Sequence, residues 1–348
     1  MPPMPEPAVI GWDVGGAHLK AAAVGHDLAV LEVMQLPCPL WRGLDPLMAA
    51  VDQVLERTGG AACHALTMTG EMADLFQDRA EGVARLVDLL QQRLAGSRTR
   101  FFAGTGFLDA THAKRMPQRV ASANWLASAR FVARRLKDGL LIDVGSTTTD
   151  IVPIADHEVR ARGYDDFQRL VAGELVYTGV VRTPVMALAR RVPFEGRQVP
   201  LMAELFATMA DVHRLTGALP EHADQWPAAD GGEKSAEGSA RRLARMIGRD
   251  AASALPAAWR RLASWLARRQ QDQIEAACRR VLAAAALGRA APVVGAGVGR
   301  FVAVRVAARL ERPYCDFARL FDRVRTDPDW LASCAPAVAV ACLAAEEA

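Results

Sequence analysis

The sequence predicts an α/β protein built from two duplicated lobes, each with a mixed sheet, around a central cleft. Its 348 residues exceed the roughly 250–300 residues at which a single hydrophobic core stops growing. A strand–turn–strand pattern occurs twice, at residues 10–20 and 141–150, and a shift of 130 positions aligns Asp13 with Asp143 and Gly15 with Gly145. Each copy continues into further short strands, and a motif that repeats together with its continuation indicates duplication.

The first lobe, residues 1–138, is predicted to open with an antiparallel meander and to continue with alternating helices and strands. Short apolar runs separated by Gly-containing turns predict the strands, while Asp45 as N-cap and Gly59 as terminator predict the first helix. The expected strands are residues 8–13, 17–24, 28–35, 62–69 and 100–103, and the expected helices are residues 45–57, 82–94 and 122–137. Pro336 predicts a terminal helix, and we expect residues 335–348 to complete this lobe and to pack back across the lobes.

The second lobe, residues 139–334, repeats the three-strand opening and carries a helical insertion at about residues 200–288. Ser235 is a good N-cap and Pro256 predicts a break between two amphipathic helices. Residues 217–239 are rich in Pro, Gly and acidic residues, which predicts an exposed or poorly ordered loop and the best candidate for a mobile flap. The expected strands are residues 140–143, 147–153, 157–161, 291–295 and 312–315, and the expected helices are residues 202–215, 235–288 and 300–310.

Charge and composition favour small-molecule substrates. The 42 basic and 39 acidic side chains leave a net charge of only +3, which demands neither nucleic acid nor an anionic membrane as partner. The six cysteines form no C-x-x-C pair, as expected of reduced thiols. No signal peptide is evident, and the apolar runs fall short of the roughly 20 residues that span a bilayer. We therefore expect a soluble cytoplasmic protein, and a homo-oligomer is compatible with the sequence.

The first hairpin has the composition of a phosphate-binding turn. Gly15 and Gly16 allow backbone N–H groups to approach an anion without side-chain obstruction. Asp13 cannot bind phosphate directly, so it predicts an intervening Mg²⁺ ion, water or hydroxyl. Period-two alternation places His18 and Lys20 on one face of the returning strand, from which Lys20 is expected to contact a phosphate oxygen.

The second hairpin offers a different set of groups. Gly145, Ser146, Thr147 and Thr148 supply backbone and hydroxyl donors, Asp143 is the second expected metal ligand, and Asp150 stands where the first copy has Lys20. Together the copies predict a cationic wall and an acidic wall around a metal–diphosphate. The alternative, two ordinary Gly hairpins with solvated charges, is disfavoured because the copies are in register.

Other candidates lie outside the hairpins. Gly295 and Gly297, in the turn at residues 295–299, follow a strand and precede a helix; a ligand contact and a packing turn are equally compatible with this pattern. Glu71 follows an apolar strand and is either a general base or metal ligand, or a helix-start acid without further function. We expect Asp211 and His213, two positions apart on a helix, to form no joint metal site.

Four stretches resemble one family within the actin, sugar-kinase and heat-shock ATPase superfamily, whose lobes have a ribonuclease H-like fold. They are similar to hydantoinase/oxoprolinase-related proteins linked to tetrahydromethanopterin-dependent one-carbon transfer. The stretches are residues 11–17, 69–74, 142–150 and 173–184, the last being the most specific.

The resemblance implies a transferase of methanofuran biosynthesis. In that reaction the phenol oxygen of γ-glutamyltyramine attacks the furanylmethyl carbon of an aminomethylfuranylmethyl diphosphate and expels diphosphate. A diphosphate leaving group calls for backbone donors, a cation and Mg²⁺, but not for ATP. Glu71 and Asp150 are the candidate bases, with Asp143 as a further catalytic candidate. The alternatives are an ATP-dependent kinase or amidohydrolase of the same fold, and a non-enzymatic actin-like accessory protein.

Overall fold

The computed structural model describes residues 6–347, which form two compact units. Unit 1 contains the described parts of Met1–Gly139, Val152–Gln168 and Asp316–Ala348, and unit 2 contains Leu140–Ile151 and Arg169–Cys315. These limits differ from the expected boundary at residue 138, because residues 152–168 and 316–334 belong to unit 1. One cause is visible at His157, whose backbone N–H bonds the carbonyl of Lys137 and whose ring contacts the carbonyl of Ala133.

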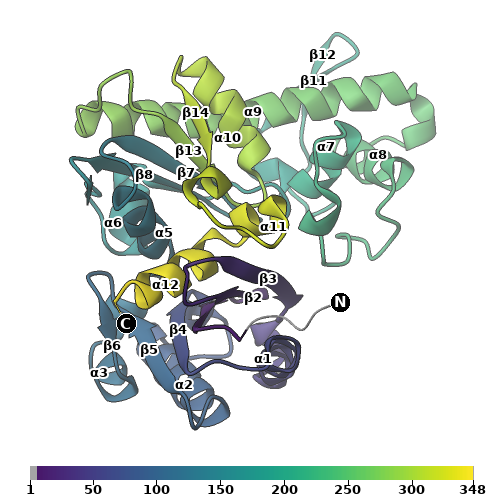
Figure 1. Ribbon diagram of the computed structural model, residues 1–348. Coiled ribbons are helices and arrows are strands. Elements are labelled where there is room, and N and C mark those ends of the chain that lie inside the picture. Colours follow the sequence, from purple (N-terminus) through teal and green to yellow (C-terminus); the bar gives the residue numbers. More distant parts are fainter. Residues whose placement is uncertain (1–5, 348) are drawn as a thin grey trace. The chain divides into compact units, whose positions relative to one another are not determined.

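Unit 1 is built on a mixed sheet with the strand order β3-β2-β1-β4-β5-β6 (Figure 1). Strands β1, β2 and β3 pair antiparallel, as the meander predicted, and β4 and β5 run parallel to β1. The strands are β1 (Val9–Val14), β2 (His18–Val24), β3 (Val30–Pro37), β4 (Cys63–Met68), β5 (Arg98–Phe102) and β6 (Phe107–Leu108).

Helices cover both faces of this sheet. Alternate side chains of β1, beginning with Ile10 and Trp12, join a core with α1 and α2, whereas Gly11 faces α12, where a Cβ would lie 2.1 Å from the carbonyl oxygen of Ala337. Glycine at position 11 thus allows α12 to lie directly on the sheet. The helices of unit 1 are α1 (Asp45–Thr58), α2 (Arg79–Arg93), α3 (Ala110–Arg115), α4 (Pro117–Val120), α5 (Asn124–Ala133), α11 (Pro328–Ser333) and α12 (Ala335–Ala345).

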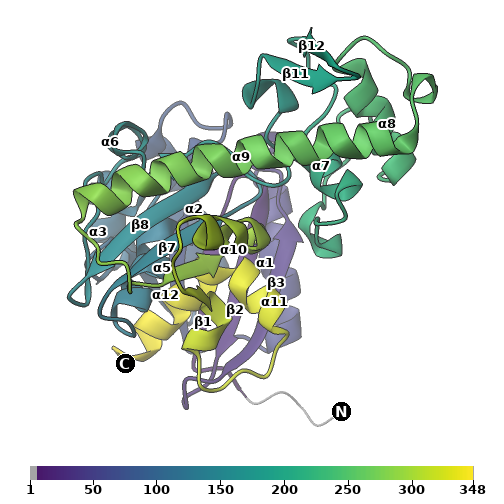
Figure 2. The same ribbon diagram turned by 90° about the horizontal axis from the view of Figure 1, so that it is seen from above.

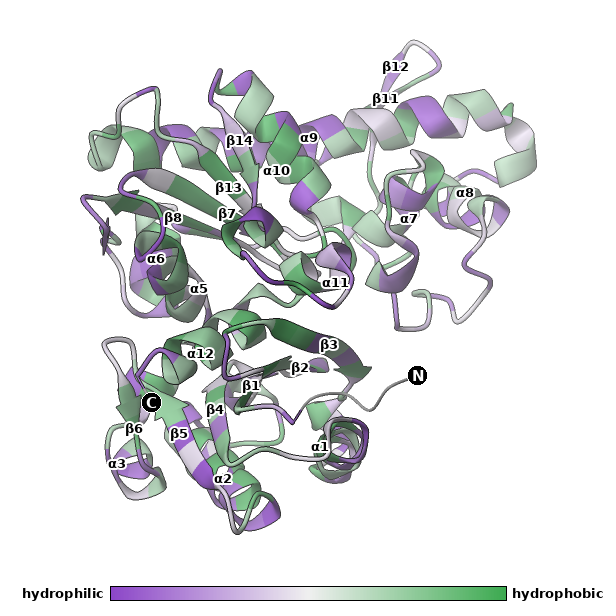
Figure 3. Ribbon diagram, in the orientation of Figure 1, coloured by the Kyte–Doolittle hydropathy of each residue, from purple (hydrophilic) through white to green (hydrophobic). Residues whose placement is uncertain are grey.

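The ends of these helices show where local signals succeeded. Gly59 adopts the left-handed conformation that ends α1, as predicted, but Asp45 is the first helical residue and Leu44 the N-cap. Helix α2 begins earlier than expected because Asp78 caps it, accepting a hydrogen bond from the N–H of Glu81. Helix α12 is apolar along its length (Figure 3) and packs on β1, β2, β4 and α5, all within unit 1.

Unit 2 repeats the arrangement in its own mixed sheet. The order is β10-β8-β7-β13-β14, with β9 also paired to β8, and β13 runs parallel to β7. In unit 1 β1 lies between its antiparallel neighbour β2 and the parallel β4, and in unit 2 β7 lies between β8 and the parallel β13, so the mixed α/β class and the duplication are confirmed. The strands are β7 (Gly139–Val144), β8 (Thr149–Ala155), β9 (Glu158–Val159), β10 (Leu175–Val176), β13 (Val293–Ala296) and β14 (Tyr314–Asp316). Helix α6 (Asp166–Ala172) crosses the boundary between the two units.

The insertion in unit 2 departs from the prediction at its start. A small hairpin, β11 (Arg191–Phe194) and β12 (Arg197–Pro200), precedes α7 (Met209–Leu215), which begins seven residues later than expected. A capping box between Thr208 and Asp211 fixes that start. Helix α8 (Ala236–Arg245) follows Ser235 as N-cap and α9 (Pro256–Ala284) begins at Pro256, as predicted. Figure 2 shows α9 extending from the insertion across unit 2, and α10 (Arg300–Arg309) completes the helices.

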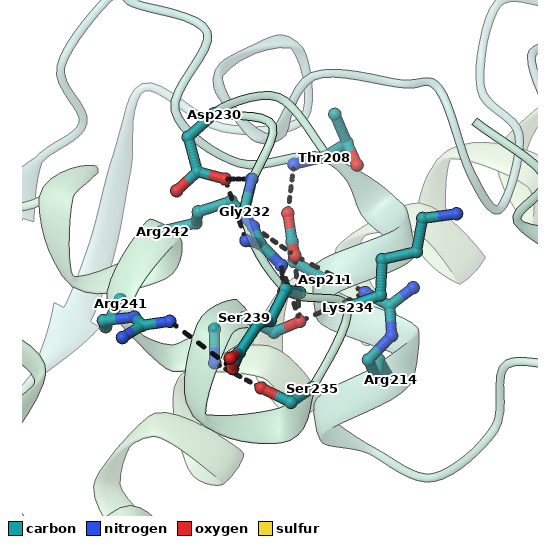
Figure 4. Close-up of polar contacts among 12 residues, drawn as sticks. Thr208, Asp211, Arg214, Asp230, Gly232, Lys234, Ser235, Ser239, Arg241 and Arg242 are labelled. Atoms are coloured by element: carbon teal, nitrogen blue, oxygen red, sulfur yellow. Dashed lines mark hydrogen bonds and ion pairs between the residues drawn. The ribbon is translucent and has the colours of Figure 1, made fainter. Parts of the chain in front are cut away.

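Residues 217–239 are largely exposed but held to the insertion by ionic contacts. Arg242, which is fully buried, donates to Asp211 at 2.8 Å, to Asp230 at 3.0 Å and to the carbonyl of Glu233 (Figure 4). Arg214 bonds Asp224 at 2.5 Å. This segment is therefore anchored from both ends, which corrects the expectation of a loosely ordered flap.

The helices described between residues 6 and 347 include none long and apolar enough to cross a membrane. The six cysteines are all free thiols.

Candidate functional site

The first hairpin turn leaves backbone open at one glycine. The N–H of Gly15 bonds the carbonyl of His18 at 3.0 Å, and a Cβ at position 15 would lie 2.9 Å from that same oxygen. At Gly16 no atom lies within 4 Å of where a Cβ would be. Gly15 is thus required by the turn itself, whereas Gly16 leaves space in which an anion can approach the backbone.

Lys20, Asp13 and Thr67 lie in one row across β2, β1 and β4. Strand register pairs Asp13 with both other residues, and the Nζ of Lys20 is 3.4 Å from the Oδ2 of Asp13. The Oδ1 of Asp13 and the Oγ1 of Thr67 are buried and make no hydrogen bond to the described residues. The lysine predicted to face phosphate therefore already has a carboxylate partner, while one oxygen of Asp13 is left to bind another group.

The second hairpin contains the same backbone hydrogen bond across its turn as the first hairpin. The N–H of Gly145 bonds the carbonyl of Thr148 at 2.8 Å, 130 residues after the Gly15–His18 bond. The carbonyls of Gly145 and Ser146 accept hydrogen bonds from the N–H groups of residues 180–182. The predicted hairpin is real, and the neighbouring segment braces it.

Gly179 makes that bracing possible. A Cβ on Gly179 would lie 2.4 Å from the backbone nitrogen of Thr147 and 2.6 Å from the carbonyl oxygen of Gly145. The hydroxyl of Thr183 accepts a hydrogen bond from the N–H of Gly179. The stretch at residues 173–184 thus supports the hairpin. The sequence marked this stretch only as the most specific part of the family resemblance and did not indicate its structural role.

The glycine turn at residues 295–299 is a packing turn. Gly297 has φ +81°, and a Cβ there would lie 2.3 Å from the Oδ1 of Asp143 and 2.3 Å from the carbonyl oxygen of Val144. Gly295 similarly lies against the ring of Tyr314. Close packing therefore requires both glycines, Gly297 against Asp143 and Gly295 against Tyr314, and ligand contact at this turn stays a prediction.

Asp150 is held in an ion pair. The Nη1 of Arg169 lies 2.8 Å from its Oδ1, and the same guanidinium donates to the carbonyl of Glu174. Arg169 is buried, with 2% of the residue exposed. A carboxylate fixed by a buried arginine fits a positioning role better than that of a base that takes up a proton.

Glu71 is in a different environment. It follows β4 in the short 3-10 turn Gly70–Met72 and is 1% exposed. Its Oε1 accepts a hydrogen bond from the hydroxyl of Ser122 at 3.0 Å, and its Oε2 makes no hydrogen bond to the described residues. Burial raises the pKa of this carboxyl, as expected of a group taken from water without full compensation. A solvated helix-start acid would show none of these features.

Glu71 belongs to a polar cluster with Ser122, Asp166 and Arg79. The sequence did not indicate these three residues as site residues. Ser122 lies in the short connection between α4 and α5, Asp166 begins α6 and Arg79 begins α2. The Oδ2 of Asp166 lies 2.7 Å from Arg79 and 3.4 Å from the Ser122 hydroxyl. Segments more than 40 residues apart supply them, so no local spacing could have indicated the group.

Two buried histidines, His64 and His213, and the buried Asp211 have partners within the fold. His64 accepts a hydrogen bond from Trp12 in the core, and burial lowers its pKa to about 4. His213 bonds Gln270, and Asp211 pairs with Arg242. Between residues 6 and 347 no group of three or more His, Cys, Asp or Glu side chains is arranged to hold a metal. A hollow of about 670 Å³ lies by β11 and the start of α9, lined by none of the predicted site residues.

Comparison with known families then decides the assignment. The model of the hydantoinase/oxoprolinase family matches residues 62–319. The chain belongs to the hydantoinase/oxoprolinase family. The match includes Glu71, the second hairpin and the stretch at residues 173–184, whereas the first hairpin precedes it.

Two curated relatives carry one name, (4-{4-[2-(gamma-L-glutamylamino)ethyl]phenoxymethyl}furan-2-yl)methanamine synthase. The protein from Methanocaldococcus jannaschii is 34% identical over 240 residues, which is 69% of this chain and 71% of that protein. The protein from Methanococcus vannielii is 36% identical over 94 residues, covering 27% of this chain and 42% of the relative.

A solved structure of acetone carboxylase in its nucleotide-free form resembles this chain in fold alone. The two structures align over 88% of this chain and 68% of the acetone carboxylase chain, with a TM-score of 0.58 and 10% sequence identity.

Proposed function

We propose that this protein is a transferase of methanofuran biosynthesis that joins the phenol oxygen of γ-glutamyltyramine to an aminomethylfuranylmethyl diphosphate and releases diphosphate. The observation that carries the proposal is the 34% identity to the Methanocaldococcus jannaschii synthase over more than two thirds of both chains. The name of that relative describes a phenoxymethyl-furan, a compound in which an ether joins a phenol oxygen to a furan-bound carbon.

The reaction exchanges one carbon–oxygen bond for another. The phenol oxygen forms a bond to the furanylmethyl carbon, the bond from that carbon to diphosphate breaks, and its electron pair leaves with diphosphate. The phenol proton goes to a base, which is useful because a phenol with a pKa near 10 is mostly protonated at neutral pH. The electron-rich furan stabilises positive charge on the carbon as the leaving group departs.

Each hairpin offers groups suited to the charge of a diphosphate. The open backbone at Gly16 supports anion approach to the first hairpin. The hydroxyls of Ser146 and Thr147, 3.4 Å apart at the second turn, supply further donors. Donors fixed before the reaction stabilise the developing negative charge without having to reorganise.

A Mg²⁺ ion fits the residues present in one limited way. The orphan Oδ1 of Asp13 is a carboxylate oxygen of the type that Mg²⁺ binds. No described cluster would enclose the ion, so we propose that Asp13 or Asp143 supplies one ligand while substrate oxygens and waters supply the rest. Bound there, the ion would offset charge on the leaving diphosphate.

The test combines purified protein with γ-glutamyltyramine, the furanylmethyl diphosphate and Mg²⁺, and follows released diphosphate and ether product. We expect both to appear in equal amounts without ATP, because the substrate already carries its leaving group. Vigorous ATP hydrolysis with no ether product would instead favour a kinase or amidohydrolase of the same fold.

A further inference from the structure

Ser122 has a backbone conformation that its residue type disfavours. Its φ is +51°, in the left-handed region that non-glycine residues rarely adopt. Such conformations cost free energy and persist where the surrounding structure imposes them, often at functional sites. Here the conformation accompanies a defined placement of the hydroxyl, which lies between two carboxylates.

That hydroxyl has one proton and two carboxylate neighbours. Its oxygen lies 3.0 Å from the Oε1 of Glu71 and 3.4 Å from the Oδ2 of Asp166. Asp166 already has a partner in Arg79 at 2.7 Å. The shorter contact and the less compensated carboxylate are both those of Glu71, so the Ser122 proton is directed there.

Glu71 is enclosed too tightly to meet a substrate itself. The backbone of α2 presses on it at Gly82, where a Cβ would lie 2.5 Å from the carbonyl oxygen of Glu71 and 2.9 Å from its Cβ. Its Oε2 is a buried oxygen without a hydrogen-bond partner among the described residues. A proton reaching this carboxylate from outside therefore has to pass through a neighbouring group, and Ser122 is the hydroxyl that touches it.

One partly exposed apolar side chain contacts this hydroxyl, and an aromatic pair includes a residue close to Ser122 in the sequence. The Sδ of Met72 lies 3.5 Å from the Ser122 hydroxyl, and 46% of Met72 is exposed. Trp125, three residues after Ser122, is buried, and its ring contacts that of Tyr164 at 6.3 Å between centroids; Tyr164 is 61% exposed. Exposed side chains of this type suit an aromatic ligand.

We propose that Ser122 relays the proton of an aromatic acceptor's hydroxyl to Glu71, with Asp166 and Arg79 as positioning residues. The proposal rests on the proposed transferase function and specifies where the phenol binds. The phenol oxygen gives its proton to the Ser122 oxygen as it attacks carbon, while the Ser122 proton moves to the Oε1 of Glu71. Diphosphate leaves with the electron pair of the broken bond, and Glu71 later returns its proton to water through the Ser122 hydroxyl.

The electrostatics of the cluster give the relay a measurable signature. Burial raises the pKa of Glu71, the Ser122 hydrogen bond and Arg79 lower it, and Asp166 raises it. Turnover should therefore fall on the acid side with an apparent pKa above the ordinary glutamate value. Asp166→Asn should move that limb to lower pH, and Arg79→Gln should move it to higher pH.

The experiment compares wild type with Ser122→Gly, Glu71→Gln and the double variant. Glycine removes the hydroxyl without adding backbone strain at the positive φ, and the thermal midpoint of each variant is measured alongside its activity. Ala286→Gly relieves the same strain at φ +51° in unit 2 and serves as the matched control. We expect each single variant to lower kcat/KM by about 10²–10⁴-fold, with the double variant no worse than either.

Infrared spectroscopy supplies a readout that does not depend on turnover. The carbonyl stretch of protonated Glu71, absent in Glu71→Gln, gives its titration directly; Ser122→Gly should raise that pKa and Asp166→Asn should lower it. If Ser122→Gly leaves the Glu71 titration unchanged, or retains wild-type kcat/KM, the relay is refuted while the transferase stands. If wild type forms no ether product, the proposed function fails and the relay fails with it.

Discussion

The closest packing at the second hairpin predicts a large effect of one methyl group. Gly297→Ala places a Cβ on a residue with φ +81°, 2.3 Å from the Oδ1 of Asp143 and 2.3 Å from the carbonyl oxygen of Val144. The left-handed conformation costs an L-residue about 1–2 kcal/mol, and overpacking a close contact costs about 1–3 kcal/mol. Together these terms predict a loss of roughly 2–5 kcal/mol in the free energy of opening β7.

Hydrogen exchange of the β7 amides measures this loss locally, which matters because a chain with two compact units need not unfold in one step. Gly288→Ala is the matched control, since no atom lies within 4 Å of its Cβ position, and it should change stability by no more than about 0.5 kcal/mol. If Gly297→Ala matches this control, then the glycine turn does not support Asp143 by packing and the structural explanation of the motif is wrong.

Three further substitutions test other parts of the structure. Gly16→Ala should leave the urea midpoint unchanged, because no atom lies within 4 Å of its Cβ position. It should weaken diphosphate binding in calorimetry, because the new methyl group occupies the space in which the anion approaches the backbone. Unchanged affinity would show that the first hairpin is not part of the site. Arg169→Met should lower the free energy of unfolding in urea by about 3–5 kcal/mol, because it removes the buried partner of Asp150. Adding Asp150→Asn should recover part of that loss. Equal stability of the single variant and wild type would contradict the ion pair. The pKa of Glu71 is raised in the folded protein, so ionised Glu71 lowers the free energy of unfolding above that pKa, and this cost disappears as the pH falls below the pKa of the unfolded chain. Glu71→Gln should therefore raise the thermal midpoint at about pH 8 and change it little at about pH 4. A lower midpoint for the variant at about pH 8 would count against a buried carboxylate at this position.

Local sequence signals predicted much of the fold. Short apolar runs between Gly-containing turns located β1, β2 and β3, Gly59 marked the end of α1, and Pro256 marked the start of α9. These features succeeded because each depends on the chemistry of a few adjacent residues.

Other elements depend on distant contacts and could not be read locally. The hairpin β11–β12 contains Pro193 and Pro200, residues that argue against strands when the pairing partner is unknown. The segment at residues 217–239 has the composition of a disordered loop, yet the buried Arg242 of α8 anchors it. Its order comes from ion pairs that composition does not reveal.

In the candidate site, too, the local features could be predicted from the sequence and the long-range contacts could not. Duplication in register predicted both hairpins, and the Gly15 and Gly145 turn bonds coincide after a shift of 130 residues. The partners that decide how the acids behave, Arg169 for Asp150 and Ser122 for Glu71, come from separate segments brought together by folding. Sequence alone therefore named the carboxylates but could not choose between them as base.

The central claim is that a phenol oxygen displaces diphosphate from carbon, and isotopic labelling tests it directly. γ-Glutamyltyramine carrying ¹⁸O in its phenol is incubated with the protein and the unlabelled furanylmethyl diphosphate, and both products are analysed by mass spectrometry. We predict that the ether product retains the label and that the released diphosphate contains none. Label in phosphate, or an ether product without it, would contradict attack by the phenol oxygen on carbon.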